Sequence, residues 1–299
     1  MLKVENVTKY YDNFRAVHDL SFEIEEGEIF GLLGVNGAGK TTTFRMIMGL
    51  LDMSEGNITL DGKKINYKVT DKIGFLTEER SLLPSKTVYE QAVYYGVLKG
   101  LSEEVVNERL DEYLKRFEVE DYKYKKIKEL SKGNQQKIQF ILSVIHEPKL
   151  LILDEPFSGL DPLNVEMFKK EILRLKKNKT MIIFSSHMMQ HIEYFCDSLV
   201  ILVKGESVLK GKLSKIKEDY RKKNIIVCGD INEEEVSQIK GVLSVNKHKG
   251  EYTINIEDKS IVDSVFKKIS KYKNITKFVV EEPTLNEIFV SIVGEAYDK

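Results

Sequence analysis

A glycine-rich segment directly after an apolar run restricts the fold of this chain more than any other feature. Residues 34–41 read Gly-Val-Asn-Gly-Ala-Gly-Lys-Thr, which fits the pattern G-x-x-x-x-G-K-[ST]. The run at 28–33 (EIFGLL) predicts a strand before the segment, and residues 41–50 predict a helix after it. Glycines let backbone N–H groups approach phosphate oxygens closely, and the positive end of the following helix adds to the attraction. The segment therefore predicts a phosphate cradle on a strand–loop–helix unit.

Side chains in and beyond the cradle predict the chemistry of the site. Lys40 is expected to reach the β- and γ-phosphates, and the Thr41 hydroxyl is expected to ligate Mg²⁺. Asp154 and Glu155 follow the buried strand predicted at 150–153, and parallel α/β sheets bind ligands at the carboxyl ends of their strands. We expect Asp154 to hold Mg²⁺ through water. Glu155 is one residue further and points elsewhere in an extended chain, so it could polarise an attacking water molecule.

Unbroken apolar runs predict the fold class of the first part of the chain. Runs at 72–76, 150–153, 181–184 and 198–203 do not alternate with polar residues. Such runs are typical of strands buried on both faces in a parallel sheet that helices cover. Between these strands, helical spacing predicts a helical insertion at about 84–145. The fold class is therefore α/β, a P-loop domain with a helical insertion.

The last part of the chain follows a different pattern. A Lys-rich stretch at 210–223 precedes it; because Glu218 and Asp219 interrupt this stretch, a solvated helix or linker is favoured over a membrane-surface patch. Strand, helix, strand, strand, helix and strand are then predicted at 225–228, 232–239, 242–246, 252–256, 261–269 and 276–280. This order predicts a small α+β sandwich of the ferredoxin-like kind. The expected domains are 1–218 and an accessory domain at 224–299 without a catalytic constellation.

Composition excludes several classes of protein. The 46 Lys and Arg residues and the 47 Asp and Glu residues leave a net charge of −1, which argues against a nucleic-acid partner. Cys196 and Cys228 lie far apart in sequence and suggest neither a disulfide framework nor a zinc site, which fits a reducing cytosol. The N-terminus lacks the apolar core of a signal peptide. The apolar stretch at 138–153 is interrupted by polar residues and Pro148, so no membrane-spanning helix is expected.

With these motifs in this order, the chain resembles the ATP-binding-cassette (ABC) ATPases over residues 1 to about 215. The segment 130–136 (LSKGNQQ) is similar to the family's LSGGQ signature and stands before the acid pair, as it does in the family. Residues 158–162 (SGLDP) match the D-loop, and His187 matches the switch histidine. The C-terminal segment 283–289 (PTLNEIF) resembles the extension of ABC ATPases of the sodium-extrusion and drug-export type.

The resemblance implies roles for individual residues. Tyr11 lies where the family stacks an aromatic ring on adenine, and the adjacent Tyr10 is the alternative. The residues expected to bind ATP are Tyr11, Val17, Gly34, Asn36, Gly37, Ala38, Gly39, Lys40, Thr41, Thr42, Glu78, Ser131, Gly133, Asn134 and Asp161. Those expected to hold Mg²⁺ are Thr41, Asp154 and Glu78. Those expected to act in catalysis are Lys40, Glu155 as general base, and His187, which would hold the γ-phosphate and the attacking water in line.

The chain departs from the family pattern at two places. Glu78 occupies the position of the Q-loop glutamine; a carboxylate can still ligate Mg²⁺, but it is a worse hydrogen-bond donor and alters the charge near the γ-phosphate. In the signature, Lys132 replaces the first glycine and Asn134 replaces the glutamine, whereas the phosphate-binding Ser131 and Gly133 remain. The composite site is therefore expected to work.

The resemblance also implies an assembly. In the family, the signature of one subunit closes over the P-loop of another, so a head-to-tail dimer with two ATP molecules at its interface is expected. A homodimer is sufficient because every motif is present, and a heterodimer is the alternative. The permease is expected to be a separate chain that docks near residues 82–91 and holds this chain at the cytoplasmic face of the membrane. The C-terminal domain is expected to modulate dimer closure or contact the permease.

The expected function is the ATP-hydrolysing subunit of an ABC exporter, with sodium, peptide antibiotic, drug and lipid all open as cargo. A soluble ABC ATPase acting on ribosomes or DNA is the alternative, which the single P-loop, the lack of sustained heptads and the near-zero net charge disfavour. A P-loop kinase or GTPase outside the family is disfavoured by the signature and D-loop, and a guanine-specific N-K-x-D motif is absent.

Overall fold

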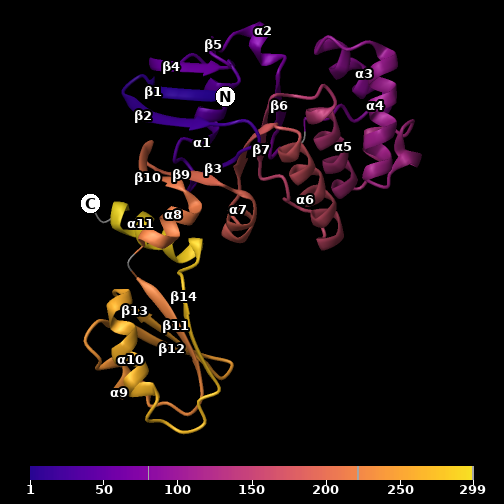
Figure 1. The fold of residues 1–299 in the computed structure, drawn as a ribbon. Helices are drawn as coiled ribbons and strands as arrows, with labels where there is room; N and C mark the ends of the chain where they lie inside the picture. Colours follow the sequence, from indigo (N-terminus) through magenta and orange to yellow (C-terminus); the bar gives the residue numbers. More distant parts are fainter. Residues whose placement is uncertain (80, 221, 298–299) are drawn as a thin grey trace. The chain divides into compact units, whose positions relative to one another are not determined.

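The strand that precedes the P-loop lies inside a six-stranded sheet in the computed structural model, which describes residues 1–79, 81–220 and 222–297 (Figure 1). The strand order is β10-β9-β3-β8-β7-β6. The bounds are β3 Ile29–Gly34, β6 Ile73–Leu76, β7 Leu150–Asp154, β8 Met181–Ser185, β9 Ser198–Val203 and β10 Glu206–Lys212. From β9 through to β6 every pairing is parallel, and β3, β8 and β9 are buried along their whole length. The predicted parallel sheet of an α/β domain is confirmed.

The chain divides into two compact units, Met1–Lys210 and Gly211–Lys299. The expected boundary lay between residues 218 and 224, whereas helix α8 (Leu213–Asp219) belongs to the second unit. Part of the Lys-rich stretch, which was expected to be a solvated helix or a linker, is this helix, and its Leu213 and Ile216 are buried. Residue 221 of that stretch and residues 298–299 of the expected second domain lie outside the described residues.

A second, antiparallel sheet covers the P-loop side of the first unit and was not predicted. Its order is β2-β1-β4-β5, with bounds β1 Leu2–Tyr11, β2 Phe14–Ile24, β4 Glu55–Leu60 and β5 Lys63–Lys64. Register shifts in β1 interrupt the alternation of buried and exposed residues, which removes the period-two signal of a strand. Phe22 of β2 stacks on Phe30 of β3 with ring centroids 4.5 Å apart, so one apolar core joins the two sheets. Helices in this unit include α1 Lys40–Ile47, α2 Tyr67–Thr70, α6 Pro162–Lys177 and α7 Met189–Phe195.

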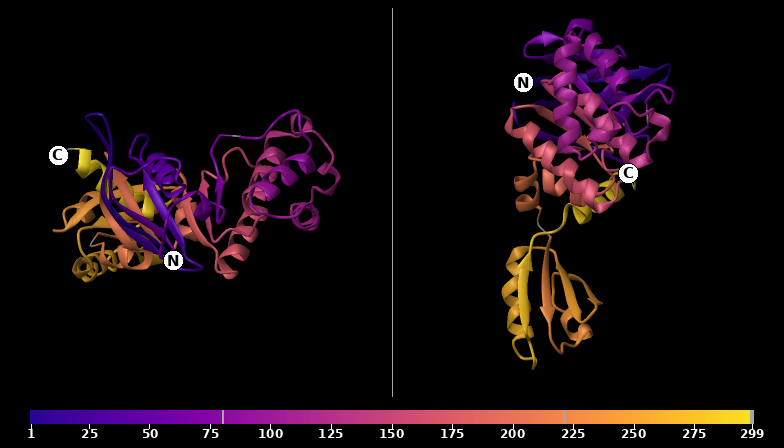
Figure 2. Two further views of the ribbon diagram at one scale, coloured as in Figure 1. Left: turned by 90° about the horizontal axis from the view of Figure 1, so that it is seen from above. Right: turned by 90° about the vertical axis from the view of Figure 1, so that its right-hand side faces the viewer.

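A helical part lies beside the two sheets (Figures 1 and 2). It consists of α3 Val88–Leu98, α4 Glu103–Arg116 and α5 Lys132–Val144, with short 3₁₀ turns η1 Glu120–Tyr122 and η2 Ile127–Glu129. Each helix begins at a hydroxyl side chain that accepts a hydrogen bond from the first turn: Thr87, Ser102 and Ser131. The predicted helical insertion is confirmed, and local capping chemistry explains where its helices begin.

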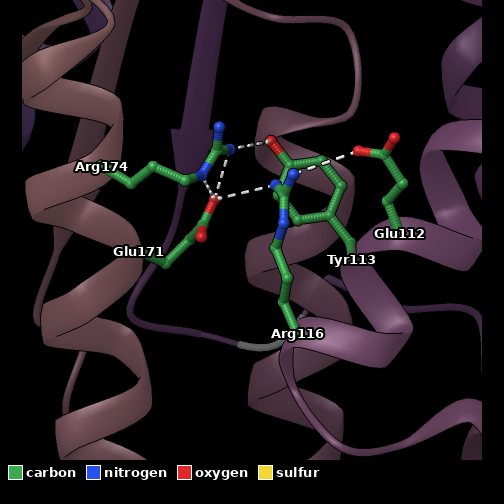
Figure 3. A network of polar contacts seen from close by, with 5 residues as sticks. All are labelled: Glu112, Tyr113, Arg116, Glu171 and Arg174. Atoms are coloured by element: carbon green, nitrogen blue, oxygen red, sulfur yellow. Dashed lines mark hydrogen bonds and ion pairs between the residues drawn. The ribbon is translucent and has the colours of Figure 1, made fainter.

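A polar network ties the helical part to α6 (Figure 3). Glu171 on α6 has a side chain that is only 7% exposed, and its Oε1 accepts hydrogen bonds from Arg174 Nε at 2.8 Å and Nη2 at 2.5 Å. Arg116 Nη1 of α4 lies 3.6 Å from the same oxygen. Arg174 also donates to the Tyr113 hydroxyl at 3.2 Å, and burial raises the pKa of Tyr113 to about 12. The buried carboxylate is thus neutralised by two arginines from different helices.

The second unit is built on a four-stranded sheet of order β12-β13-β11-β14. Its strands are β11 Lys223–Cys228, β12 Val242–His248, β13 Glu251–Ile256 and β14 Lys277–Glu281, and its helices are α9 Glu233–Ser237, η3 Lys259–Ile261, α10 Val262–Ile269 and α11 Leu285–Tyr297. All its pairings are antiparallel, and the chain order β-α-β-β-α-β with this strand order is that of a ferredoxin-like sandwich. The predicted topology is confirmed.

The PTLNEIF segment anchors α11 to this sheet. Thr284 N donates to Glu287 Oε2 at 2.8 Å, which caps the first turn of the helix. Asn224 Nδ2 of β11 donates to both oxygens of the Glu287 carboxylate, at 2.9 and 3.0 Å. The residues that the sequence singled out here therefore join a helix to a strand. Among the residues that the structure describes, no helix is both long enough and apolar enough to span a bilayer.

Candidate functional site

A cavity of about 290 Å³ opens where β3, β7 and β8 end. It is lined by Tyr11, Phe14, Ala16, Asn36, Gly37, Ala38, Gly39, Lys40, Thr41, Thr42, Glu78, Asp154, Glu155 and His187. All the residues expected to be catalytic or to hold Mg²⁺ are in this set. Six residues expected to bind ATP do not line it: Val17, Gly34, Ser131, Gly133, Asn134 and Asp161. Phe14 and Ala16 line it and were missed, because no short motif marks them.

The backbone of the P-loop requires glycine at two places. Gly34 has φ 155°, and a Cβ there would lie 2.6 Å from the carbonyl oxygen of Leu202. Gly39 has φ 105°, and a Cβ there would lie 2.6 Å from the carbonyl oxygen of Ala16. Neither position accepts a side chain without moving backbone, so the loop must keep both glycines. The Val17 side chain, which is fully buried, packs behind Gly39 and supports the loop instead of facing the cavity.

Lys40 begins α1 and folds back over the loop. Its Nζ donates to the carbonyl oxygens of Gly34 at 2.7 Å and Val35 at 3.3 Å. Burial lowers the pKa of Lys40, and the charges of Asp154, Glu155 and Glu78 oppose that shift. A phosphate group would supply the negative charge that favours the protonated amine in this partly desolvated place.

The acid pair is held by two serines at the end of β8: Ser185 is the last residue of that strand, and Ser186 follows it. Ser185 Oγ donates to Asp154 Oδ1 at 2.5 Å, and Ser186 Oγ donates to Glu155 Oε2 at 3.3 Å. Glu155 Oε1 is buried without a hydrogen-bond partner in the described part of the chain, and His187 Nε2 lies 3.6 Å from it. Burial raises the pKa of both carboxyl groups. Glu155 also has φ 49°, so the chain turns sharply at this residue.

The turn between β1 and β2 presents two aromatic rings to the cavity. Tyr11 and Phe14 are paired across this hairpin, and their exposed fractions are 41% and 65%. Tyr10 does not line the cavity, and its backbone N–H donates to Ser54 Oγ at 3.1 Å. Of the two neighbouring tyrosines, Tyr11 is therefore the one placed to stack on a planar base.

Comparisons with known proteins identify the family. Residues 17–158 match the family described as ABC transporter, and residues 211–293 match the C-terminal domain of DrrA1-3-like ATP-binding proteins. The uncharacterized ABC transporter ATP-binding protein YhaQ of Bacillus subtilis (strain 168) is 46% identical over 298 residues, which is 100% of each chain. This chain belongs to the ATP-binding proteins of ABC transporters.

Other relatives are similar over long stretches. NatA, an ABC transporter ATP-binding protein of Bacillus subtilis (strain 168), is 38% identical over 71% of this chain and 87% of its own length. The linearmycin resistance ATP-binding protein LnrL of the same organism is 31% identical over 98% of each chain. Among solved structures, an ATP-binding subunit of an ABC transporter has a TM-score of 0.70 and 31% identity, covering 74% of this chain and 93% of that one. The dimeric cassette MJ0796 bound to ADP and Pi has a TM-score of 0.65 and 26% identity, covering 71% of this chain and 99% of that one.

The ABC signature of this chain lies at the start of α5, away from its own nucleotide cavity. Ser131 caps the helix by accepting from Asn134 N at 3.3 Å. Asn134 Nδ2 donates to the hydroxyl of Tyr122 at 3.1 Å, a partner that the sequence did not reveal. A Cβ on Gly133 would lie 3.8 Å from Asn164 Nδ2 and from Leu160 Cδ2, an ordinary packing distance, and Ser131 is exposed. The helix N-terminus is thus available to an anion from outside this chain's own cavity.

The D-loop begins α6 in a similar way. Asp161 accepts from Asn164 N at 2.9 Å and from Asn164 Nδ2 at 2.6 Å. These bonds lower the pKa of Asp161, so its carboxylate is held as a helix cap. Asp161 does not line the cavity that contains Lys40 and Glu155.

The oxygen donors of the cavity fit a hard divalent cation. The Thr41 hydroxyl and the carboxylates of Asp154 and Glu78 line the same cavity, and Mg²⁺ binds one or two carboxylates with phosphates and water. The charge of Glu78 contributes to raising the pKa of Asp154, so the two carboxylates are electrostatically coupled. No cluster of three or more His, Cys, Asp or Glu side chains able to hold a metal alone was found among the described residues.

Proposed function

We propose that this chain is the ATP-hydrolysing subunit of an ABC exporter and powers a separate membrane permease through ATP-driven closure of a head-to-tail dimer. One observation carries the proposal: the site is divided. The P-loop, Asp154, Glu155 and His187 share one cavity, whereas the signature residues Ser131 and Gly133 do not line it. A second copy that supplies its signature would complete the site.

Within the cavity, the chain's own residues account for the hydrolytic step. The P-loop N–H groups and Lys40 would bind the phosphates, and Tyr11 would stack on adenine. Glu155 would accept a proton from the attacking water as the water oxygen bonds to the γ-phosphorus. The bond between the γ-phosphorus and the oxygen that bridges it to the β-phosphate breaks, so ADP leaves with that oxygen. His187 would hold the water and the γ-phosphate in line. When bound, Mg²⁺ neutralises charge on the β- and γ-phosphates. Thr41, Asp154 and Glu78 are the residues that would hold it.

Two kinds of support favour a dimer. The similar MJ0796 cassette is dimeric in a state bound to ADP and Pi. The caps at Ser131 and Asp161 also present their helix N-termini outside the chain's own cavity, where the phosphates of a second subunit's nucleotide could bind. A homodimer provides two complete sites, and a heterodimer is the alternative.

A second cavity supports coupling to a permease. It measures about 390 Å³ and lies between the segment around β6 and the helical part. Apolar side chains such as Phe75, Leu82 and Tyr95 line it together with Lys99 and His146. An amphipathic helix could place an apolar face here, and Leu82, the first residue of the predicted docking segment 82–91, lines the cavity. The chain would then act at the cytoplasmic face of the membrane.

The direction of transport is proposed from relatives. LnrL is named for linearmycin resistance, and the second unit matches the DrrA1-3-like C-terminal domain. Export of the compound is one way to make a cell resistant to it, and the segment 283–289 resembles the extension of drug-export ABC ATPases, so export is the proposed direction.

The test combines purification and catalysis. Tagged chain expressed in its native cell should co-purify with a polytopic membrane protein, and the complex should hydrolyse ATP in a Mg²⁺-dependent manner. Deleting that membrane protein should sensitise cells to at least one exported compound. A chain that hydrolyses ATP yet never associates with a membrane protein would instead support the soluble ABC ATPase.

A further inference from the structure

Gln139 lies in the middle of α5, on the same helix that begins with the signature, and its side chain reaches into the loop after β6. The residue is 4% exposed. Its Nε2 donates to Thr77 Oγ1 at 2.9 Å, to the carbonyl oxygen of Thr77 at 3.2 Å and to the carbonyl oxygen of Glu79 at 3.2 Å. Thr77 Oγ1 in turn donates to the carbonyl oxygen of Glu79. One amide group is therefore hydrogen-bonded to the residues on both sides of Glu78.

The orientation of this amide follows from its partners. Backbone carbonyl oxygens can only accept hydrogen bonds, so the nitrogen of the Gln139 amide must face Thr77 and Glu79. A side chain of similar size without an N–H donor would remove the donor to the Thr77 carbonyl oxygen and one of the two donors to the Glu79 carbonyl oxygen. Apolar packing alone cannot replace these hydrogen bonds.

The loop held in this way carries a residue of the nucleotide cavity. Glu78 lines the cavity together with Lys40 and Asp154. Its charge opposes the lowering of the Lys40 pKa and contributes to raising the Asp154 pKa, so the electrostatic effect of its carboxylate reaches both groups. β6 ends at Leu76, and beyond it the Gln139 bonds fix the backbone on each side of Glu78.

We propose that Gln139 is a positioning residue that holds Glu78 against the nucleotide cavity and thereby sets the Mg²⁺ requirement of the site. The proposal rests on the proposed function, in which Glu78 helps to hold Mg²⁺ beside the bound nucleotide. Glu78 stands where the family has a glutamine, and a carboxylate forms fewer kinds of hydrogen bond than an amide. Because Gln139 of α5 fixes the backbone on both sides of Glu78, the residue stays at the cavity without such bonds of its own. Through Gln139, the helix that begins at Ser131 is hydrogen-bonded to both residues that flank Glu78.

The test uses the full chain and the Gln139→Met variant. Methionine is unbranched, helix-compatible and close in size to glutamine, but it donates no hydrogen bond. Ser143→Ala is the matched control: Ser143 lies one turn further along α5 and is buried, but it donates only to the Phe140 carbonyl oxygen within its own helix. Thr77→Val, which removes one acceptor from the other side, is the second variant.

Two readouts separate positioning from general stability. The first is a Mg²⁺ titration of the binding of a fluorescent, non-hydrolysable ATP analogue; the second is the kcat for ATP hydrolysis. We expect Gln139→Met to raise the half-saturating Mg²⁺ concentration about tenfold and to lower kcat about tenfold to hundredfold, since small misplacements in a site have effects of this size. Binding of the analogue without Mg²⁺ should change less than about twofold. Thr77→Val should shift both readouts in the same direction by less, and Ser143→Ala should match the wild type.

A double-mutant cycle with Glu78→Ala decides whether Gln139 acts through Glu78. Without the Glu78 carboxylate, Gln139→Met should change the Mg²⁺ requirement by less than about twofold. An undiminished effect in that background, or a Gln139→Met variant indistinguishable from Ser143→Ala, would overturn the inference. A wild-type chain that binds the analogue without any Mg²⁺ dependence would instead overturn the proposed function, so the two failures are distinguishable.

Discussion

Replacing Glu155 with glutamine is the sharpest test of the proposed chemistry. The two side chains have the same shape, so Ser186 Oγ, 3.3 Å from Glu155 Oε2, still finds an oxygen acceptor. The change therefore removes the charge and the proton acceptor while leaving the packing intact. General-base catalysis contributes about 10²–10⁴-fold to a rate. No donor among the described residues bonds Glu155 Oε1, so none there competes with an attacking water for this oxygen. We expect a loss of about 10³-fold, or about 4 kcal/mol, in the middle of that range.

The assay measures phosphate release in a single turnover, with binding of a fluorescent ATP analogue and light scattering in parallel. Glu155→Gln should bind the analogue with an affinity within about threefold of the wild type, because the phosphate contacts of the P-loop are unchanged. It should also accumulate as an ATP-bound dimer. Ser186→Ala keeps the carboxylate and loses one hydrogen bond, so its rate should fall by less than about tenfold. Phosphate release from Glu155→Gln within about tenfold of the wild type would refute Glu155 as the base.

Four further outcomes follow from the geometry. Burial raises the pKa of Glu155, and a general base works only when it is deprotonated. As the pH is lowered, kcat should therefore begin to fall at a higher pH than it would with a glutamate of ordinary pKa; a kcat–pH profile of the wild type checks this. Lys40→Ala removes a charged phosphate contact of about 1.5–3 kcal/mol, so titration with the analogue should show about 10- to 100-fold weaker binding. Tyr11→Ala should weaken that binding by about 1–3 kcal/mol through lost base stacking, whereas Tyr10→Ala should change it little; the reverse order would assign the base to Tyr10. Glu171→Ala leaves two arginines without their shared carboxylate. Urea unfolding should show that the free energy of unfolding falls by about 2 kcal/mol, which is less than for a fully buried pair because both arginines are partly exposed.

Much of the fold could be predicted because its signals are local. Unbroken apolar runs marked the strands β3 and β6 to β9, and helical spacing marked the helical part. The ferredoxin-like order of the second unit was also readable from alternating strand and helix patterns. The first antiparallel sheet was not, because register shifts in β1 disturb the alternation on which such a prediction depends.

Some residues of the candidate site could likewise be predicted from local motifs, and others could not. Lys40, Thr41, Asp154, Glu155, and His187 each stand in a short motif next to a strand end, so their meeting at one edge of the sheet could be foreseen. Phe14, Tyr122 and Gln139 stand in no such motif. Their roles depend on partners distant in sequence or across a hairpin, and the pattern of neighbouring residues says nothing about which surfaces pack together.

The sequence by itself determined the phosphate-binding loop and the residue types beside it, because backbone conformation and helix polarity depend on a few consecutive residues. Only the tertiary structure decided between Tyr11 and Tyr10 by placing Tyr11 at the cavity, and it placed Phe14 and Ala16 there as well. It also decided that Gln139 fixes the loop around Glu78. These outcomes depend on how sheets and helices pack across long stretches of chain, and such packing is settled by the whole core at once.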